Sequence, residues 1–276
     1  MRLKNILFLT GGLFVIMLLI ASCEKMLQMP NDSLLPEDKA FVDEFSARSS
    51  VMRVYGLLQD VAQQLIILGE LQGDLLTVTE NADNDLRQLN EHRADATNIY
   101  TDPSGFFKVI VNCNEVLHKI HRARENDENI SELELATYTA ELKLIRAWVY
   151  FKLVQIYGQV PYFEEPLSDY NQSLSLTSKL ESLQTEDFIL DTILAQIVEV
   201  DTFELNMLEE SPFFALRFNK FTNWALQGDI HLWRNNYSQA RVTYDRVADI
   251  LASEGFAGTT RLPYLSTFNF QDVNWK

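Results

Sequence analysis

The stretch between residues 131 and 161 constrains the fold of this 276-residue chain more than any other. Ser131 followed three positions later by Glu134 is the pattern of a capping box, which predicts that a helix begins here. Within residues 144–157 the strongly polar side chains are Arg146, Lys152 and Gln155. A helix that is apolar nearly all round must be buried among other elements. Gly158 should end this helix, and Pro161 prevents it from resuming.

Helical spacing recurs along the chain. Apolar side chains repeat at steps of three and four in the segments 47–65, 107–121, 185–200, 217–234 and 237–251. Thr185 followed by two acidic residues has the composition of a helix start. Glycine and proline are scarce, at 10 and 7 residues, and no segment has the alternation expected of a multi-strand sheet. We therefore expect an all-α fold, with long irregular loops at residues 77–104 and 158–183.

The last two expected helices carry a more specific pattern. The positions concerned are Trp224, Gly228, Tyr237, Ala240 and Tyr244. Their spacing matches the tetratricopeptide repeat, in which glycine lets two helices approach and alanine and an aromatic side chain fill the groove between them. Gln227 and His231 depart from the repeat, and its late proline is missing. The pattern predicts stacked, tetratricopeptide-like helix pairs.

The amino terminus has the features of an export signal. A short basic start with Arg2 and Lys4 precedes an apolar run from Ile6 to Ile20, which is shorter than the roughly 20 residues of a membrane span. Residues 20–23, Ile-Ala-Ser-Cys, resemble a bacterial lipobox. We expect a signal peptide at residues 1–22 and lipid attachment at Cys23. The alternative is an ordinary secretory signal followed by an incidental cysteine.

The cysteine content agrees with lipidation. The chain has two cysteines, so a lipid on Cys23 leaves Cys113 without an intrachain partner. Cys113 lies in an apolar helical pattern, which predicts a buried, inert thiol. Acyl chains contribute roughly 0.8 kcal/mol per buried methylene, so several chains hold a soluble domain on a bilayer. Residues 23–46 then form a lipidated tether, and residues 47–276 the helical domain.

Charge limits the possible partners. Acidic residues outnumber basic ones by 39 to 23, which gives a net charge of −16. A field of this sign repels phosphate backbones, so we expect no nucleic-acid partner. Attachment to an anionic membrane surface would equally need something other than electrostatics.

Catalytic and metal-binding signatures do not appear. The nucleophile elbow, the zinc-protease motif, the P-loop and the dinucleotide fingerprint are all missing, so we do not expect an enzyme or a cofactor. His118 and His121 are three apart on a helix but have no third ligand at metal spacing. Glu164 and Glu165 could be mistaken for a catalytic carboxylate pair, but adjacent acidic residues of this kind are ordinarily solvent-exposed.

The polar stretch 77–104 is the candidate ligand site. Asn81, Asp83 and Asp85 alternate as at the start of a calcium loop, but the glycine and glutamate that an EF-hand requires are missing; a looser calcium site stays open. Their side chains can instead hydrogen-bond the hydroxyls of a ligand. Tyr100 lies in the same loop and is harder to assign to a core than the aromatic residues at helical spacing, such as Trp233. We expect Tyr100, Asp83, Asp85 and Asn81 to contact the ligand.

The stretch from Glu141 to Pro161 resembles the signature of the SusD/RagB family. The shared features, in order, are an acidic residue, Arg146-Ala147, the aromatics Tyr150 and Phe151, Leu153-Val154, Tyr157, Gly158 and Val160-Pro161. Further similarities are Gly73-Asp74, the helix from Phe106 to Ile120 with Asn112 and Asn114, the segment from Thr185 to Asp191, and the helix pair from Trp224 to Tyr244.

The resemblance implies a function. Members of this family are cell-surface lipoproteins of the outer membrane, with a tetratricopeptide-like scaffold that binds glycans or sometimes peptides. They act without catalysis, as lids over a TonB-dependent outer-membrane transporter. The resemblance implies that Cys23 carries the lipid, and it identifies no ligand-binding residue in this sequence. Family members also continue with a carboxyl half that this chain, ending at Lys276, lacks, so the helical domain is expected to be incomplete. The other hypotheses are a helical scaffold that holds a protein without a small ligand, and an enzyme whose catalytic signature lies in that half.

Overall fold

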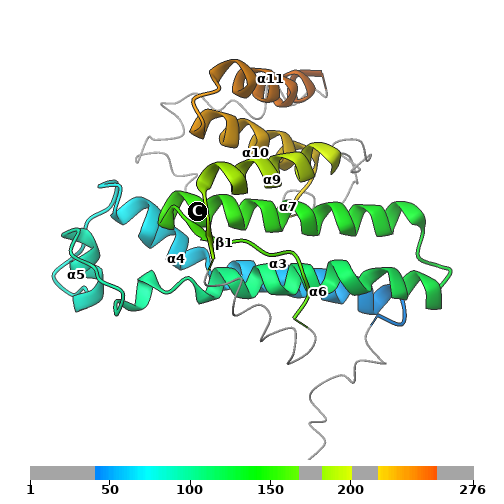
Figure 1. The fold of residues 1–276 in the computed structure, drawn as a ribbon, viewed down its shortest axis with the longest axis horizontal. Coiled ribbons are helices and arrows are strands. Elements are labelled where there is room, and N and C mark those ends of the chain that lie inside the picture. The colour runs from blue at the N-terminus through cyan, green and yellow to red at the C-terminus, as the bar shows by residue number, and fades with distance from the viewer. Residues whose placement is uncertain (1–40, 168–181, 201–216, 254–276) are drawn as a thin grey trace, which may run out of the picture. The chain divides into compact units, whose positions relative to one another are not determined.

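The computed structural model describes residues 41–167, 182–200 and 217–253 (Figure 1). The expected signal peptide, Cys23 and the tether as far as residue 40 lie outside the described residues. None of the helices in the described ranges combines the length and apolar character that crossing a membrane requires.

The described part of the chain is helical apart from one short two-stranded sheet, which confirms the all-α expectation. In chain order its elements are α3 (Glu44–Asp60), α4 (Ala62–Ile66), the π-helix η2 (Ile67–Leu71), α5 (Asn84–Asn90), the 3₁₀-helix η3 (Ile99–Thr101), α6 (Ser104–Asn126), α7 (Glu132–Tyr157), β1 (Val160–Pro161), β2 (Leu183–Gln184), α9 (Glu186–Val200), α10 (Lys220–Trp233) and α11 (Tyr237–Ser253).

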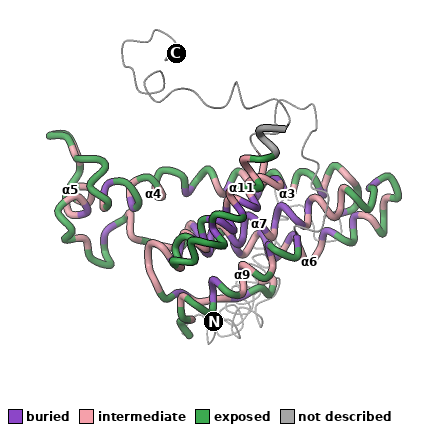
Figure 2. Tube along the Cα trace, turned by 90° about the horizontal axis from the view of Figure 1, so that it is seen from above, coloured by how far each residue is buried: buried purple, intermediate pink, exposed green. Residues whose placement is uncertain are grey.

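Helix α7 is the centre of the packing. It contacts α3 and α6 on one side and α9 and α10 on the other, and α11 packs on α10 (Figure 1). Most of its residues between Tyr138 and Val154 are therefore buried, and buried residues are purple in Figure 2. Tyr150, Leu153 and Ile145 are fully buried. Each such side chain contributes about 1.5–3 kcal/mol of hydrophobic stabilisation, and the expected burial of this helix is confirmed.

Both ends of α7 form as the sequence predicts. The Ser131 hydroxyl accepts a hydrogen bond from the backbone N–H of Glu134 at 3.1 Å, and the Glu134 carboxylate accepts one from the backbone N–H of Ser131 at 2.9 Å. Gly158 follows the helix with φ +73°, a conformation that a side chain would strain. The chain then turns back along the bundle.

A small sheet in the next connection was not expected. Strand β1 pairs antiparallel with β2, with Val160 opposite Gln184. Two residues per strand are too few to produce a recognisable alternation in the sequence. The pairing fixes the start of α9 one residue after β2, where the Thr185 hydroxyl accepts a hydrogen bond from the N–H of Phe188 at 3.3 Å.

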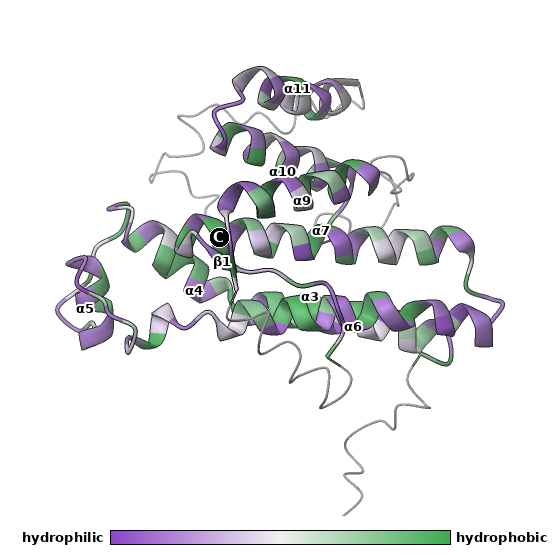
Figure 3. Ribbon diagram, viewed as in Figure 1, coloured by the Kyte–Doolittle hydropathy of each residue, from purple (hydrophilic) through white to green (hydrophobic). Residues whose placement is uncertain are grey.

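The first helix and the loop after it also differ in detail from what the sequence predicts. The helix is interrupted at Val61 and ends as a π-helix, rather than continuing regularly to residue 65. The loop at 77–104 contains α5, whose side chains are mostly hydrophilic (Figure 3). Only Leu89 of this helix is buried, where it packs with Leu68 and Leu71. A single buried side chain in seven residues gives no helical period, so the sequence pattern could not reveal α5.

Candidate functional site

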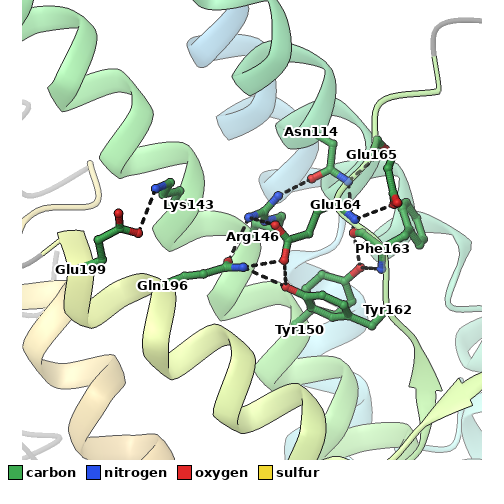
Figure 4. A network of polar contacts seen from close by, with 10 residues as sticks. All are labelled: Asn114, Lys143, Arg146, Tyr150, Tyr162, Phe163, Glu164, Glu165, Gln196 and Glu199. Atoms are coloured by element: carbon green, nitrogen blue, oxygen red, sulfur yellow. Dashed lines mark hydrogen bonds and ion pairs between the residues drawn. The ribbon is translucent and has the colours of Figure 1, made fainter.

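Arg146 is the centre of a buried polar network at the junction of α6, α7 and α9 (Figure 4). Its guanidinium donates to Asn114 Oδ1 at 2.8 Å and to Gln196 Oε1 at 2.9 Å. It also forms an ion pair with Glu164 at 3.3 Å. The Arg146 side chain is 5% exposed, and its charge is balanced by the Glu164 carboxylate. Its two terminal nitrogens donate to these partners, whereas its buried Nε has no hydrogen-bond partner among the described residues.

The network fixes the segment that follows β1. The Asn114 amide donates to the backbone carbonyl oxygen of Phe163 at 3.2 Å. The Tyr150 hydroxyl donates to the same carbonyl at 2.9 Å and accepts from the Phe163 N–H at 3.0 Å. Buried backbone groups outside regular structure need such partners. The helices α6 and α7 therefore set the position of residues 162–165.

A hollow of about 390 Å³ opens beside this segment and is lined by Tyr162, Phe163, Glu164, Glu165, Ser182 and Gln184. The Tyr162 hydroxyl donates to Glu164 and accepts from the Gln196 amide at 3.1 Å. Burial, followed by the neighbouring Glu164 carboxylate, raises the pKa of Tyr162. A neutral phenol, carboxylates and an amide can hydrogen-bond hydroxyl groups, so this hollow has the chemistry of a polar, uncharged ligand site.

The predicted ligand residues come together in part. The Tyr100 hydroxyl donates to Asp83 Oδ2 at 3.1 Å, and Asp85 Oδ2 lies 3.5 Å from the backbone nitrogen of Ile99. Asp83 also caps α5 by accepting from the Leu86 N–H at 2.8 Å. Asn81 is exposed. These carboxylates have structural roles, and their contact with a ligand stays a prediction.

Tyr100 is partly buried against an apolar cluster. Its ring packs against the cluster of Leu68, Leu71 and Leu89. Burial and then the Asp83 carboxylate raise the pKa of Tyr100, so the hydroxyl stays protonated. The ring is held at the surface in one orientation, as a ligand-contacting aromatic residue requires.

Trp233 is a surface residue that the sequence interpretation assigned to the core. Tyr150, Phe151 and Trp224, which lie at helical spacing, are buried, whereas Trp233 at the end of α10 is 43% exposed. The only sequence signal for this difference is its position directly before the Arg234-Asn235-Asn236 turn.

The residues described contain no group of three or more His, Cys, Asp or Glu side chains able to hold a metal ion. Cys113 is fully buried, as expected, and burial raises the pKa of its thiol to about 12.

Comparison with known families identifies the chain. The SusD-like family model described as "Starch-binding associating with outer membrane" matches residues 27–203, which is more than half of the chain. The chain belongs to the SusD-like family. Arg146 and the Val160-Pro161 pair of the family signature thus belong to the elements that position the segment after β1.

Relatives of this SusD-like chain are distant and longer. It is 22% identical to SusD-like protein P38 of Formosa agariphila, over 99% of this chain and 51% of the relative. It resembles the crystal structure of a SusD superfamily protein from Bacteroides thetaiotaomicron with a TM-score of 0.66 and 22% identity, over 78% of this chain and 49% of that one. It also resembles surface glycan-binding protein A from Bacteroides uniformis, with a TM-score of 0.61 and 18% identity, over 74% and 45% of the two chains. The chain thus spans about half the length of these relatives, and the structural likeness establishes the fold.

Proposed function

We propose that this protein binds a carbohydrate at the bacterial cell surface, without catalysis, and passes it to a TonB-dependent outer-membrane transporter. The observation that carries the proposal is the family match over residues 27–203. The name of the Bacteroides uniformis protein, which describes glycan binding at a surface, supports the same ligand class. Two surface sites with the right chemistry, around Tyr100 and around Tyr162, support it independently.

Carbohydrate binding is tested with a glycan array and then by titration with the oligosaccharide that binds. Tyr100→Ala should weaken that binding because the ring supported by Leu68 and Leu89 is lost. Tyr100→Phe is the matched control, since it keeps the ring and removes only the hydrogen bond to Asp83. Binding that is unchanged in Tyr100→Ala would remove Tyr100 from the site. A protein that binds no glycan on the array would contradict the proposed function itself.

Membrane attachment is proposed to depend on a lipid at Cys23. Cys23→Ala should release the protein from the membrane fraction while leaving the helical fold intact. Mild detergent extraction of the unaltered protein should recover a large β-barrel partner, because the proposed function requires a transporter. Membrane retention of Cys23→Ala, or extraction without such a partner, would contradict this part of the proposal.

A protein-binding scaffold is the second candidate. It is favoured by exposed apolar side chains on the last helix pair, where Leu232, Tyr237 and Val242 are each at least 48% exposed. If the glycan array shows no binding and the protein instead binds a partner protein tightly, this alternative is favoured.

A further inference from the structure

The segment that carries Tyr100 belongs to a lobe, residues 62–103, which lies at one end of the structure and includes α4 and α5 (Figure 1). The chain enters this lobe after α3 and returns to the bundle with α6. A Cβ atom added at Gly105 would be 3.0 Å from Cγ1 of Val61, so the entry and the exit of the lobe lie against each other. Contacts at this neck therefore determine how the residues beyond it are placed.

Gln64 of α4 joins the two sides of the neck. Its amide nitrogen donates to the backbone carbonyl oxygens of Tyr100 and Asp102, each at 2.7 Å. These two hydrogen bonds account for both N–H donors of the amide. Its amide oxygen lies 3.7 Å from the position of a Cβ at Gly105. One side chain thus holds the backbone on either side of Thr101 against α4.

The backbone around Tyr100 has little support of its own. The 3₁₀-helix η3 is three residues long, and 3₁₀ turns have poor hydrogen-bond geometry. Asn98, which is 2% exposed, supports it from within the lobe. Its side-chain oxygen accepts from the Tyr100 N–H at 3.1 Å, and its amide donates to the Asp85 carbonyl oxygen at 2.9 Å. Asn98 therefore ties η3 to α5, whereas Gln64 ties it to the helix that continues from the bundle.

The ring of Tyr100 rests on the same part of the neck. Leu68 follows Gln64 by four positions, which places both residues on one side of the α4–η2 segment. Leu68 belongs to the apolar cluster against which the Tyr100 ring packs. The hydrogen bonds from Gln64 to the backbone thus set where the ring meets Leu68.

We propose that Gln64 is a positioning residue for carbohydrate binding. It holds the backbone of Tyr100 so that the ring stands where a sugar can contact it, and it does not itself contact the sugar. The inference rests on the proposed function and on Tyr100 as a ligand contact, and it adds to them a residue 36 positions earlier in the chain.

The test is a double-mutant cycle of Gln64→Met and Tyr100→Ala in the full chain, measured by calorimetric titration. The probe is the oligosaccharide that binds best on a glycan array containing maltoheptaose and laminarihexaose. Methionine keeps the length and helix preference of glutamine but has no donor. Gln64→Met should weaken binding by about threefold to tenfold, because two hydrogen bonds to the backbone are lost. In Tyr100→Ala the same change should alter binding by less than about twofold, because the ring that Gln64 positions is absent.

Gln63→Met is the matched control. Gln63 is the exposed neighbour of Gln64 on α4, and its side chain makes no hydrogen bond to any residue in the described ranges. This variant should bind the probe like the unaltered protein. Hydrogen exchange without sugar gives a second measurement. In Gln64→Met the amides of residues 99–101 should exchange about threefold to tenfold faster, while unchanged amides in α7 show that the bundle is intact.

The outcomes separate the two proposals. Equal weakening by Gln64→Met with and without the Tyr100 ring overturns the positioning role, because the effect then does not pass through Tyr100. Binding or hydrogen exchange that Gln64→Met leaves unchanged overturns it as well. In each of these cases the proposed function stands. Binding of no oligosaccharide on the array overturns the proposed function and, with it, this inference.

Discussion

The ring of Tyr244 on α11 lies directly over the Cα of Gly228 on α10. A Cβ atom added at residue 228 would be 2.5 Å from Cε1 of that ring, which is closer than real side chains approach. The Tyr244 hydroxyl donates to Asp229, which holds the ring in place. This is the close approach that the tetratricopeptide-like spacing of the two residues predicts.

Gly228→Ala should therefore destabilise the protein. The intrinsic helix preference of alanine favours the change by up to about 1 kcal/mol, but displacing the Tyr244 ring costs about 1–3 kcal/mol, so we expect a net loss. Urea unfolding measures it. Gly56→Ala is the control, because a Cβ at that α3 position meets nothing within 4 Å and should be neutral or stabilising. Equal effects at the two glycines would show that the Tyr244 contact is unimportant.

Arg146→Lys should be strongly destabilising despite conserving the charge. A lysine ammonium cannot reach Asn114, Gln196 and Glu164 together, so the buried Asn114 oxygen or the partly buried Gln196 oxygen loses its donor. We expect a loss of about 2–4 kcal/mol in urea unfolding. Arg241→Lys is the matched control on the surface, where the arginine side chain is 82% exposed, and it should change stability by less than about 0.5 kcal/mol. A small effect at Arg146 would mean that the network contributes little.

Asp83→Ala should loosen α5 without unfolding the bundle. The Asp83 carboxylate caps this helix, and losing a cap costs about 1 kcal/mol. Hydrogen exchange of the amides in residues 84–90 should accelerate about fivefold, while amides of α7 should not change. Asp83→Asn keeps a capping oxygen and should exchange like the unaltered protein. Acceleration throughout the chain would contradict a local role.

Stability should fall as the solution becomes alkaline. Burial raises the pKa of the Cys113 thiol from 9.0 to about 12, so the folded protein keeps a proton that the unfolded chain loses above pH 9. This stabilising contribution is complete below that pH and is lost between about pH 9 and 12, at up to about 1.4 kcal/mol per unit. The raised pKa values of the partly buried Tyr55 and the buried Tyr150 act in the same direction.

Urea unfolding at neutral and alkaline pH measures this loss. Cys113→Ala should lose less stability over the alkaline range than the unaltered protein, whatever its stability at neutral pH. An identical pH dependence in both proteins would show that the thiol does not titrate differently on folding.

Thiol counting tests Cys113 and Cys23 together. With a thiol reagent, membrane-extracted native protein should react at neither cysteine, because Cys113 is fully buried and Cys23 is proposed to carry lipid. Unfolding in guanidinium should expose one reactive thiol. Two reactive thiols after unfolding would show that Cys23 is free, and one in the native state would show that Cys113 is accessible or that Cys23 is unmodified.

The sequence by itself determined the helices whose ends and buried faces have local signatures. The capping box at Ser131, the glycine at 158 and the all-round apolar run between them define α7 without reference to the rest of the chain. The spacing of Gly228 and Tyr244 likewise defines the last pair. The resemblance of the Arg146 motif to a family signature was sufficient to indicate the family that the comparisons confirm.

Only the tertiary structure decided which side chains share a site. The partners of Arg146 lie 18 to 50 positions away along the chain, and no local period relates them. The small helix α5 buries one leucine, and it becomes visible only where Leu89 meets Leu68 and Leu71. Trp233 lies on α10 together with the buried Trp224, but it is 43% exposed because α10 ends there. Periodicity reports the face of a helix, whereas the depth of burial depends on which other helices cover that face.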